Sequence, residues 1–213
     1  GQVLDIVPNH MAIDSEENDL WWDVLENGRA SRYAMYFDID WQTAESKLYG
    51  KVLLPVLGEH YGRVVEKGDL HVDRAGSAFT VSYYEHTTPL APESLQPILA
   101  TAGERVHSDW LVFLADSLGA LPTATDGDAV QRRHRIKTVL LDQLTRLLEE
   151  HTSVAAAVDG VINEINTDPD AMDQLLGRQY YRLAFWRTAG RELNYRRFFN
   201  IDSLAGIAVE NQD

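Results

Sequence analysis

The chain has 213 residues, of which 45% are hydrophobic and 24% charged, as is typical of a soluble globular protein with a sizeable core. Its 19 lysines and arginines and its 33 acidic residues give a net charge of −14, so nucleic acid and anionic membranes, which attract clustered positive charge, are unfavourable partners. The chain contains no cysteine, which excludes disulfides and thiolate chemistry and is compatible with a cytoplasmic location, and no apolar run reaches the roughly 18 residues of a membrane span.

The first residues predict a strand that ends in a ligand site. Residues 3–7 form a short apolar run rich in β-branched side chains, and Pro8 ends the run, so they predict a buried strand of a parallel sheet. Asp5 lies within this strand, and Asn9 and His10 follow it. Ligands bind at the carboxyl ends of such strands in α/β barrels and open α/β sheets. Because a parallel strand needs neighbours on both sides, we expect the chain to be a piece of a longer protein.

The next residues offer two further candidates for binding. Trp21 and Trp22 either fill the core or form a platform for carbohydrate, since the C–H faces of sugars pack on indole rings. Residues 33–41 alternate aromatic and acidic side chains and place Asp38 and Asp40 on one side of an extended segment. Such a pair suits acid–base chemistry or a hard cation, but solvated or locally hydrogen-bonded carboxylates are much more common.

A small amount of β-structure is predicted before residue 92. Residues 51–57 are apolar but contain Pro55, which predicts an edge strand or an irregular strand. Residues 69–73 and 78–84 alternate polar and apolar side chains and predict an antiparallel hairpin, with its turn at residues 73–76.

From about residue 94 the periodicity becomes helical. Residues 95–121 predict a helix whose apolar face includes Trp110 and Phe113, although Gly103 weakens its middle. Residues 153–165 predict a short helix, and Asp168 with Pro169 predicts the start of another that runs to about residue 190.

Between these helices the sequence predicts a longer one. Residues 126–128 offer its amino-terminal cap, and its apolar stripe includes Ile136, Val139 and the leucines that follow. The basic residues 132–135 near its start are either a phosphate binder or, more commonly, solvated helix surface.

Residues 194–199 form the second candidate site. Arg196 and Arg197 are flanked by Tyr195 and by two phenylalanines, and this combination of planar donors with aromatic surface suits the recognition of hydroxyl groups. The alternative is that the arginines pair with acids while the aromatic side chains fill a core.

Seven segments, taken together and in this order, resemble the maltooligosyltrehalose synthases, a family of the α-amylase superfamily of glycoside hydrolases. These segments are residues 5–10, 21–28, 36–41, 51–58, 181–186, 194–199 and 204–206. The resemblance implies a (β/α)8 barrel with a subdomain inserted after its third strand. The chain would then be an α/β fragment, mainly α, in which residues 1–12 are barrel strand 3 and its conserved region, 13–92 the β-containing part of the inserted subdomain, 93–203 its helical part, and 204–213 the return toward the barrel.

The resemblance also implies an activity for the parent enzyme. This activity converts the reducing-end α-1,4 linkage of a maltooligosaccharide to an α,α-1,1 linkage, by a retaining intramolecular transglycosylation of trehalose biosynthesis. Retaining enzymes use two carboxyl groups about 5–5.5 Å apart. The superfamily carries its catalytic carboxylates in later motifs that this chain lacks, so we expect the chain alone to be inactive and the rest of the barrel to be its partner. We expect neither a cofactor nor a metal.

For the site residues, the resemblance implies that His10 binds the sugar at the cleaved bond, Asn9 shapes that subsite and Asp5 organises the strand end. It also favours Tyr195, Arg196 and Arg197 as part of the substrate cleft. Without the resemblance, His10 is more often a structural histidine. The alternatives are a stand-alone carbohydrate-binding or helical interaction module, and a part of another glucan hydrolase or transferase of the same superfamily.

Overall fold

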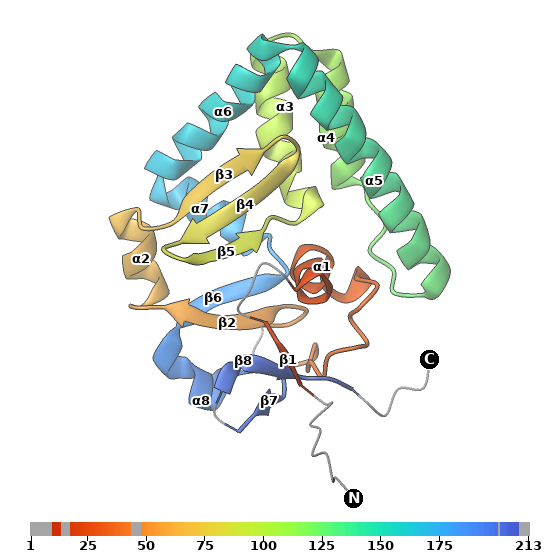
Figure 1. The fold of residues 1–213 in the computed structure, drawn as a ribbon. Coiled ribbons are helices and arrows are strands. Elements are labelled where there is room, and N and C mark those ends of the chain that lie inside the picture. Colours follow the sequence, from red (N-terminus) through yellow and green to blue (C-terminus); the bar gives the residue numbers. More distant parts are fainter. Residues whose placement is uncertain (1–9, 14–17, 44–47, 200, 209–213) are drawn as a thin grey trace, which may run out of the picture.

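The computed structural model describes residues 10–13, 18–43, 48–199 and 201–208, without the side chain of Asp202. The predicted strand at residues 3–7 lies outside the described residues, and so do Asp5 and Asn9. The described part of the chain is mixed α/β and mainly helical. It contains three small sheets, and the helices α3, α4, α5 and α6 extend to the top of Figure 1.

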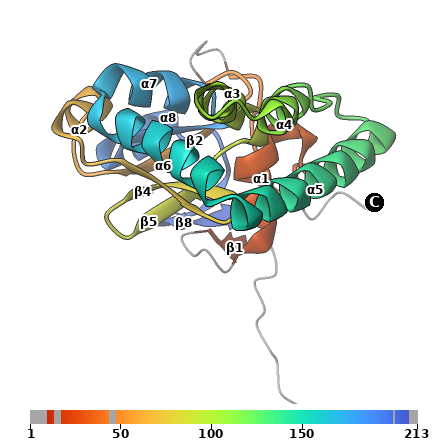
Figure 2. The same ribbon diagram turned by 90° about the horizontal axis from the view of Figure 1, so that it is seen from above.

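Helices α3, α4, α5 and α6 lie around and above the sheet of β3, β4 and β5. Helices α5 and α6 descend on opposite sides from a common apex, and α3 and α4 lie behind them in Figure 1, while Figure 2 shows the same helices from above. The bounds are α1 (Asp19–Asn27), α2 (Tyr61–Lys67), α3 (Gln96–Arg105), α4 (Asp109–Gly119), α5 (Gly127–Glu150), α6 (Thr152–Thr167), α7 (Pro169–Gly177) and α8 (Ala189–Glu192), with 3-10 turns η1 (Gly28–Ala30), η2 (Pro92–Leu95) and η3 (Trp186–Thr188).

The strands pair in three separate groups. One antiparallel sheet has the order β1-β8-β7, a parallel pair consists of β2 and β6, and an antiparallel sheet has the order β3-β4-β5. The bounds are β1 (His10–Ala12), β2 (Val52–Leu57), β3 (His71–Ala75), β4 (Ala78–Tyr83), β5 (His86–Pro89), β6 (Tyr181–Phe185), β7 (Arg197–Phe198) and β8 (Ile201–Gly206).

Strand β2 is irregular, as the proline in it predicts. Its register against β6 shifts between Leu54 and Leu57, on either side of Pro55, which has no amide hydrogen to donate. The predicted hairpin is also confirmed, as β3 and β4, and β5 extends it by a third strand. Its turn comes later than predicted, because Ala75 pairs with Ala78 and leaves Gly76 as the first turn residue, at φ 62°.

The capping signals in the sequence are confirmed. The side chain of Asp126 accepts a hydrogen bond from the amide of Ala129 at 2.9 Å and caps α5. Asp168 likewise accepts from Asp170 at 2.9 Å and caps α7, with Pro169 as the first helical residue.

The prediction of a single helix at residues 95–121 is wrong, because the segment contains two helices. The chain breaks between α3 and α4, where His107 has φ 53° and Ser108 begins the second helix by accepting from the amide of Leu111. Gly103 has a packing role, because a Cβ at this position would lie 2.8 Å from Cγ2 of Val112. The two helices therefore pack closely side by side at the residue that weakens the helical prediction.

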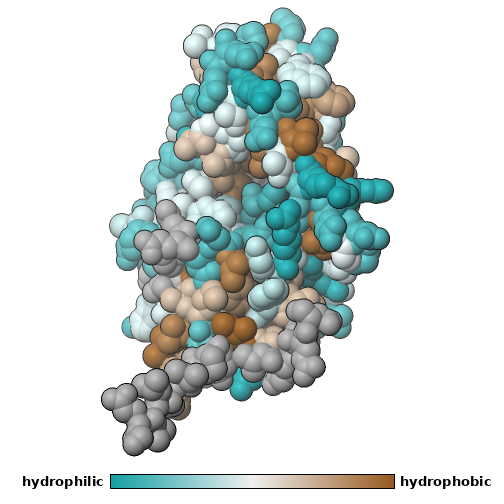
Figure 3. All heavy atoms as spheres, turned by 45° about the vertical axis from the view of Figure 1, so that its right-hand side comes forward, coloured by the Kyte–Doolittle hydropathy of each residue, from teal (hydrophilic) through white to brown (hydrophobic). Residues whose placement is uncertain are grey.

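The break also changes which side chains are buried. Trp110 and Phe113 stack on each other at the surface, 47% and 52% exposed, rather than facing the core as predicted. On α5, Ile136 and Val139 are likewise exposed, while the leucines that follow are buried. Figure 3 shows the face on which α5 lies as mainly hydrophilic, with scattered hydrophobic side chains.

The predicted end of the helix that starts at Asp168, at about residue 190, is also wrong. Helix α7 ends at Gly177, and the next residues form β6, where Tyr181 and Leu183 are buried and Arg182 between them is partly exposed. Residues 181–185 instead pair in parallel with β2, so their backbone hydrogen bonds go to a strand that is far away in the sequence.

One large core joins these elements. It contains Trp21 and Val24 of α1, strand residues such as Leu57, and helix residues such as Leu114 and Val158. No helix within the described residues combines the length and the apolar character that crossing a membrane would require.

Candidate functional site

A pocket of about 390 Å³ opens beside α1, and its walls are mainly apolar, with three tryptophans and a tyrosine among them. It lies between α1, β2, β5 and the residues that follow β6, so segments from both halves of the sequence form it. The side chains that matter most for binding are Trp21, Trp22, Trp186, Tyr195, Glu85 and His86. We call this space the aromatic pocket.

The two tryptophans of α1 have different roles. Asn18 caps the helix by accepting from the amide of Trp21 at 3.0 Å, which fixes the first turn. Trp21 is 2% exposed and makes edge-to-face contacts with Phe37 and Tyr195, at ring-centroid distances of 4.9 and 5.4 Å. Trp22 is only partly buried and lines the same pocket. Trp21 is therefore a core residue that also forms pocket wall, whereas Trp22 offers ring surface to a ligand.

Trp186 completes the aromatic walls. It stands in η3 directly after β6 and is 54% exposed. The guanidinium carbon of Arg187 lies 5.1 Å from the centre of its ring, and Phe185 packs against it edge to face. These contacts hold the indole in place while leaving ring surface free.

Polar groups stand at one edge of the aromatic pocket. The turn between β4 and β5 brings Glu85 and His86 there, with 4.0 Å between the His86 Nε2 and a Glu85 carboxylate oxygen. Thr88 also lines the pocket, but its hydroxyl already donates to the Tyr181 hydroxyl at 2.9 Å. Apolar ring surface beside a few hydrogen-bonding groups is the arrangement that binds a compact polyhydroxyl ligand.

The predicted residue His10 lies close to this pocket. It is on β1 and pairs with Gly206 of β8, while Ile13 and Ser203 from the same region line the pocket. The ring of His10 packs edge to face on Phe198 at 4.4 Å. Its Nδ1 is buried and has no hydrogen-bond partner within the described part of the chain.

Tyr195, Arg196 and Arg197 are adjacent in sequence but face different surroundings. Tyr195 is 6% exposed and forms pocket wall, and burial raises the pKa of its hydroxyl. Arg196 is exposed and pairs with Asp38, with 3.7 Å between the guanidinium and the carboxylate. Arg197 is partly buried on β7.

The carboxylates Asp38 and Asp40 each interact with other groups and do not form a paired site for acid–base chemistry or a cation. This is the more common of the two predicted arrangements. Asp38 pairs with Arg196, and a carboxylate oxygen of Asp40 accepts from the amide of Gln42 at 2.9 Å. The first interaction joins distant parts of the sequence and the second is local, and neither pairs the two carboxylates with each other. Across the described residues, no group of three or more histidine and acidic side chains could hold a metal ion.

Asn194 is a key residue that the sequence analysis did not single out. Its buried amide donates to the carbonyls of Asp40 and Lys51, at 3.0 and 2.8 Å, and accepts from the amide of Leu53 at 2.9 Å. It thereby fastens the segment that carries Tyr195 to the edge of β2. No local pattern indicates this role, because all its partners are distant in the sequence.

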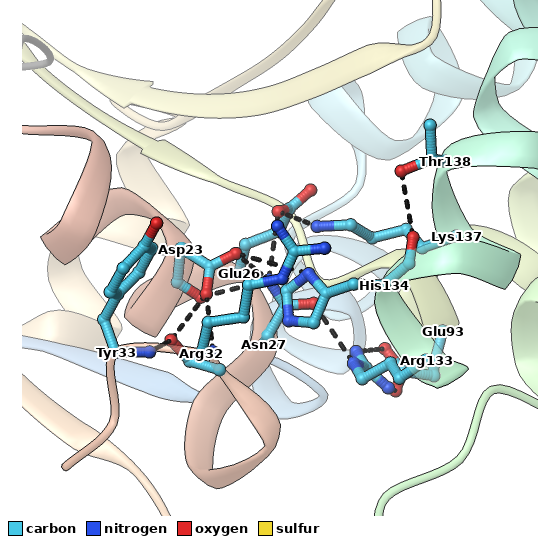
Figure 4. A network of polar contacts seen from close by, with 11 residues as sticks. Asp23, Glu26, Asn27, Arg32, Tyr33, Glu93, Arg133, His134, Lys137 and Thr138 are labelled. Carbon is cyan, nitrogen blue, oxygen red and sulfur yellow. Dashed lines mark hydrogen bonds and ion pairs between the residues drawn. The ribbon is translucent and has the colours of Figure 1, made fainter. Parts of the chain in front are cut away.

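The basic residues 132–135 are predicted to be either a phosphate binder or solvated helix surface, and neither prediction describes all of them. Arg132 and Arg135 are exposed, as helix surface should be, but Arg133 is fully buried and its guanidinium bonds both carboxylate oxygens of Glu93. Figure 4 shows this contact within a polar network between α1 and α5. A buried arginine needs such a partner, because an uncompensated charge away from water is costly.

The rest of the network joins the same two helices. Lys137 donates to Glu26 at 2.6 Å, and the Nδ1 of His134 lies 3.7 Å from a carboxylate oxygen of Asp23. Burial lowers the pKa of His134, although Asp23 opposes this effect. The network positions α1, which carries Trp21 and Trp22, against the long helix α5.

Comparisons with known proteins point to one family. No family model matches the chain. Two curated proteins from two strains of Mycobacterium tuberculosis, both described as maltooligosyl trehalose synthases, are 48% identical to it over 59 residues, which is 27% of this chain and 7% of each of theirs.

Two solved structures match almost the whole chain. A glycosyltrehalose synthase gives a TM-score of 0.54 at 21% identity, and the maltooligosyltrehalose synthase from Arthrobacter ramosus gives 0.53 at 28% identity, each over 98% of this chain. The matches cover 19% and 17% of those two chains. The chain is therefore similar to a portion of the maltooligosyltrehalose synthases, in sequence over part of its length and in fold over nearly all of it.

Proposed function

We propose that this chain is the inserted subdomain and adjoining barrel strand of a maltooligosyltrehalose synthase, and that it forms part of the site for the maltooligosaccharide. The parent enzyme would convert the reducing-end α-1,4 linkage to an α,α-1,1 linkage. The similarity to the synthases of Mycobacterium tuberculosis and Arthrobacter ramosus supports the family, and the aromatic pocket supports the role in substrate binding.

The aromatic pocket is the observation that carries this proposal. An α-linked glucan presents the apolar faces of its glucose rings and a rim of hydroxyl groups. Trp22 and Trp186 offer partly exposed indole surface to such faces, and His86 and Glu85 offer hydrogen-bonding groups at the edge. The volume of about 390 Å³ is at the lower end for ligand pockets, which suits one or two sugar units.

The predicted residues keep their proposed roles in this arrangement. His10 would contact the sugar at the cleaved bond, and its unpartnered buried Nδ1 is consistent with a hydrogen bond that substrate or another part of the enzyme supplies. Asn9 would shape the same subsite, and Asp5 would organise the strand end. Tyr195 would form cleft wall from within the core, and Arg196 and Arg197 would stand at the margin of the cleft.

The chemistry would depend on groups outside this chain. A retaining transfer needs a nucleophilic carboxylate and a second carboxylic acid about 5–5.5 Å apart. The superfamily motifs that hold these residues are absent from the sequence. This chain would bind and orient the glucan, and its aromatic walls would help to exclude water, which favours transfer within the substrate over hydrolysis.

The proposal is tested by titrating the 213-residue chain with maltopentaose and following tryptophan fluorescence and amide chemical shifts. We expect Trp22→Ala to weaken binding about fivefold or more, because stacking on an aromatic ring contributes about 1 kcal/mol or more. Trp110→Ala is the matched control, since Trp110 is an exposed tryptophan on α4 outside the pocket. His10→Ala tests the predicted subsite in the same way, and no non-reducing sugar should form in the mixture.

Two results would contradict the proposal. If Trp110→Ala weakens binding as much as Trp22→Ala, the aromatic pocket is not the sugar site. If the chain alone forms non-reducing sugar from maltopentaose, it contains the catalytic groups and the assignment of these groups to the rest of the enzyme is wrong.

A stand-alone carbohydrate-binding module remains a second candidate, because the aromatic pocket is formed entirely by this chain. The natural open reading frame on both sides of the sequence separates the two. Flanking barrel motifs would support a synthase, or a glucan hydrolase or transferase of the same superfamily. Flanking sequence of another kind would support the module.

A further inference from the structure

A second pocket, of about 340 Å³, lies where η1, the start of β2 and the end of α7 meet. Its lining includes three cationic side chains, Arg29, Lys51 and Arg178, and no carboxylate. Acidic residues outnumber basic ones by 33 to 19 in the whole chain, so this composition is unusual for the molecule. We call this space the basic pocket.

The three cations are brought together by Tyr180. Its carbonyl accepts from the amide of Val52 at 2.8 Å, which sets Lys51 beside the residues that follow α7. Its ring packs so closely on Gly28 that a Cβ at Gly28 would lie 2.5 Å from its Cδ1. Gly28 has φ 56°, and the residue after it is Arg29. Core contacts therefore fix the three segments around the basic pocket.

The charges in the basic pocket are poorly compensated. Within the part of the chain that the structure describes, the guanidinium groups of Arg29 and Arg178 take part in no hydrogen bond or ion pair. Lys51 donates to the carbonyl of Gly177 at 2.6 Å, which leaves two ammonium hydrogens without a partner among the described residues. Burial, and then Arg182 nearby, lowers the pKa of Lys51, so its environment lacks the negative charge that would favour the ammonium.

The shape and chemistry indicate what the basic pocket would accept. Two arginines and a lysine suit a doubly charged oxyanion, because guanidinium groups bind phosphate through paired hydrogen bonds. A free phosphate would leave part of the 340 Å³ empty. Tyr49, which is 59% exposed, and the hydroxyl groups of Thr123 and Thr125 line the remainder and could contact a sugar-sized group.

We propose that Arg29, Lys51 and Arg178 form a binding site for the phosphate monoester of a sugar-sized molecule. This site lies apart from the aromatic pocket and shares no lining residue with it. A phosphorylated metabolite bound at the carboxyl end of α7 would contact the start of β2, whose residues Leu54 and Val56 line the aromatic pocket.

The site is tested by titrating the chain with glucose 6-phosphate, inorganic phosphate and glucose, and following the amide shifts of Gly50 and Gly177. We expect glucose 6-phosphate to bind more tightly than phosphate, glucose to leave these amides unchanged, and added salt to weaken both anions. Phosphate that binds as tightly as glucose 6-phosphate would overturn the assignment of an organic phosphate. No shift at roughly 10 mM of either anion would overturn the site altogether.

Two variants separate a built site from general charge attraction. Arg178→Gln should weaken the binding of glucose 6-phosphate by roughly tenfold or more, because it removes charge-assisted hydrogen bonds. Arg146→Gln removes the same charge from the exposed surface of α5, outside the pocket, and should change binding less than twofold, which corresponds to about 0.4 kcal/mol or less. Equal losses in the two variants would contradict the proposal. Arg178→Lys should retain part of the affinity, and a circular dichroism spectrum checks that each variant is folded.

Discussion

Asn194 illustrates how one side chain connects segments that are far apart in the sequence. Its amide bonds the backbone of Asp40, Lys51 and Leu53, and so replaces the neighbouring strand that this edge of β2 lacks among the described residues. The next residue, Tyr195, is thereby held against Trp21 as a wall of the aromatic pocket. A polar side chain in this position specifies geometry as well as stability.

We predict that Asn194→Ala lowers the free energy of unfolding by about 2–3 kcal/mol, because it leaves several buried backbone groups without partners. Asn163→Ala, at an exposed position on α6, is the control and should change stability by less than about 0.5 kcal/mol. Urea denaturation followed by tryptophan fluorescence measures both. Equal stabilities for Asn194→Ala and the unmodified chain would show that the hydrogen bonds of the Asn194 amide do not stabilise the fold.

At the scale of elements, α1 and α5 are joined by charged side chains in an otherwise apolar core. Lys137 of α5 pairs with Glu26 of α1, and His134 of α5 lies near Asp23 of α1. Arg133 of α5 donates to the side chain of Asn27 of α1 and pairs with Glu93 of η2. Replacing one partner of a buried pair costs more than the pair contributes, because a charge is left without compensation. The polar network therefore specifies how the two helices meet.

The pKa of His134 leads to a pH-dependent prediction. Burial holds it below the ordinary value of 6.5, so the unfolded chain binds a proton at a pH where the folded chain does not. The free energy of unfolding should therefore fall as the pH decreases below about 6.5, and the loss from this residue is complete once the pH passes below the folded-state pKa.

His134→Gln should remove this part of the pH dependence, whereas His71→Gln, at an exposed position on β3, should retain it. Urea denaturation of the three proteins between about pH 7.5 and 5.5 measures the slopes. Asp23, Lys137 and Arg32 surround His134 in all three proteins, so the difference between slopes reports the histidine. The same slope in His134→Gln and in the unmodified chain would contradict the prediction.

The elements also show which features the sequence could predict. Helix caps at Asp126 and Asp168 and the hairpin of β3 and β4 depend on neighbouring residues, and these predictions are confirmed. The break at His107 and the change from α7 to β6 depend on distant partners, such as Val112 packing on Gly103 and β2 pairing with β6. Local periodicity contains no information about these contacts.

The same distinction applies to the candidate site. Trp22 and Tyr195 belong to aromatic clusters that are visible in the sequence, and both line the aromatic pocket. Trp186 and His86 reach it only because β6 and β5 are assembled next to α1, so sequence reasoning missed their role there. The charged groups of the basic pocket come from three separated segments and could not be associated without the fold.

At the scale of the whole molecule, the β-containing and helical parts of the sequence share one core. Strand β2 finds its partner in β6, near the other end of the chain, and Arg74 of β3 bonds Asp159 of α6 through both carboxylate oxygens, at 2.6 and 2.9 Å. The core cluster likewise includes Val72 from the first part and Val158 from the second. Neither part buries its apolar side chains alone.

We therefore predict that the chain unfolds in a single cooperative transition, and that residues 1–92 alone do not fold. Elements that share buried side chains lose them together, so no part should remain folded when another opens. Thermal unfolding followed by far-ultraviolet circular dichroism reports mainly the helices, and tryptophan fluorescence, measured in the Trp110→Phe variant, reports Trp41 and the three tryptophans around the aromatic pocket. The two midpoints should coincide. A helical signal that persists after the fluorescence change is complete would show that α3–α6 form an independent unit, and the aromatic pocket would then be a surface between two separately folding parts.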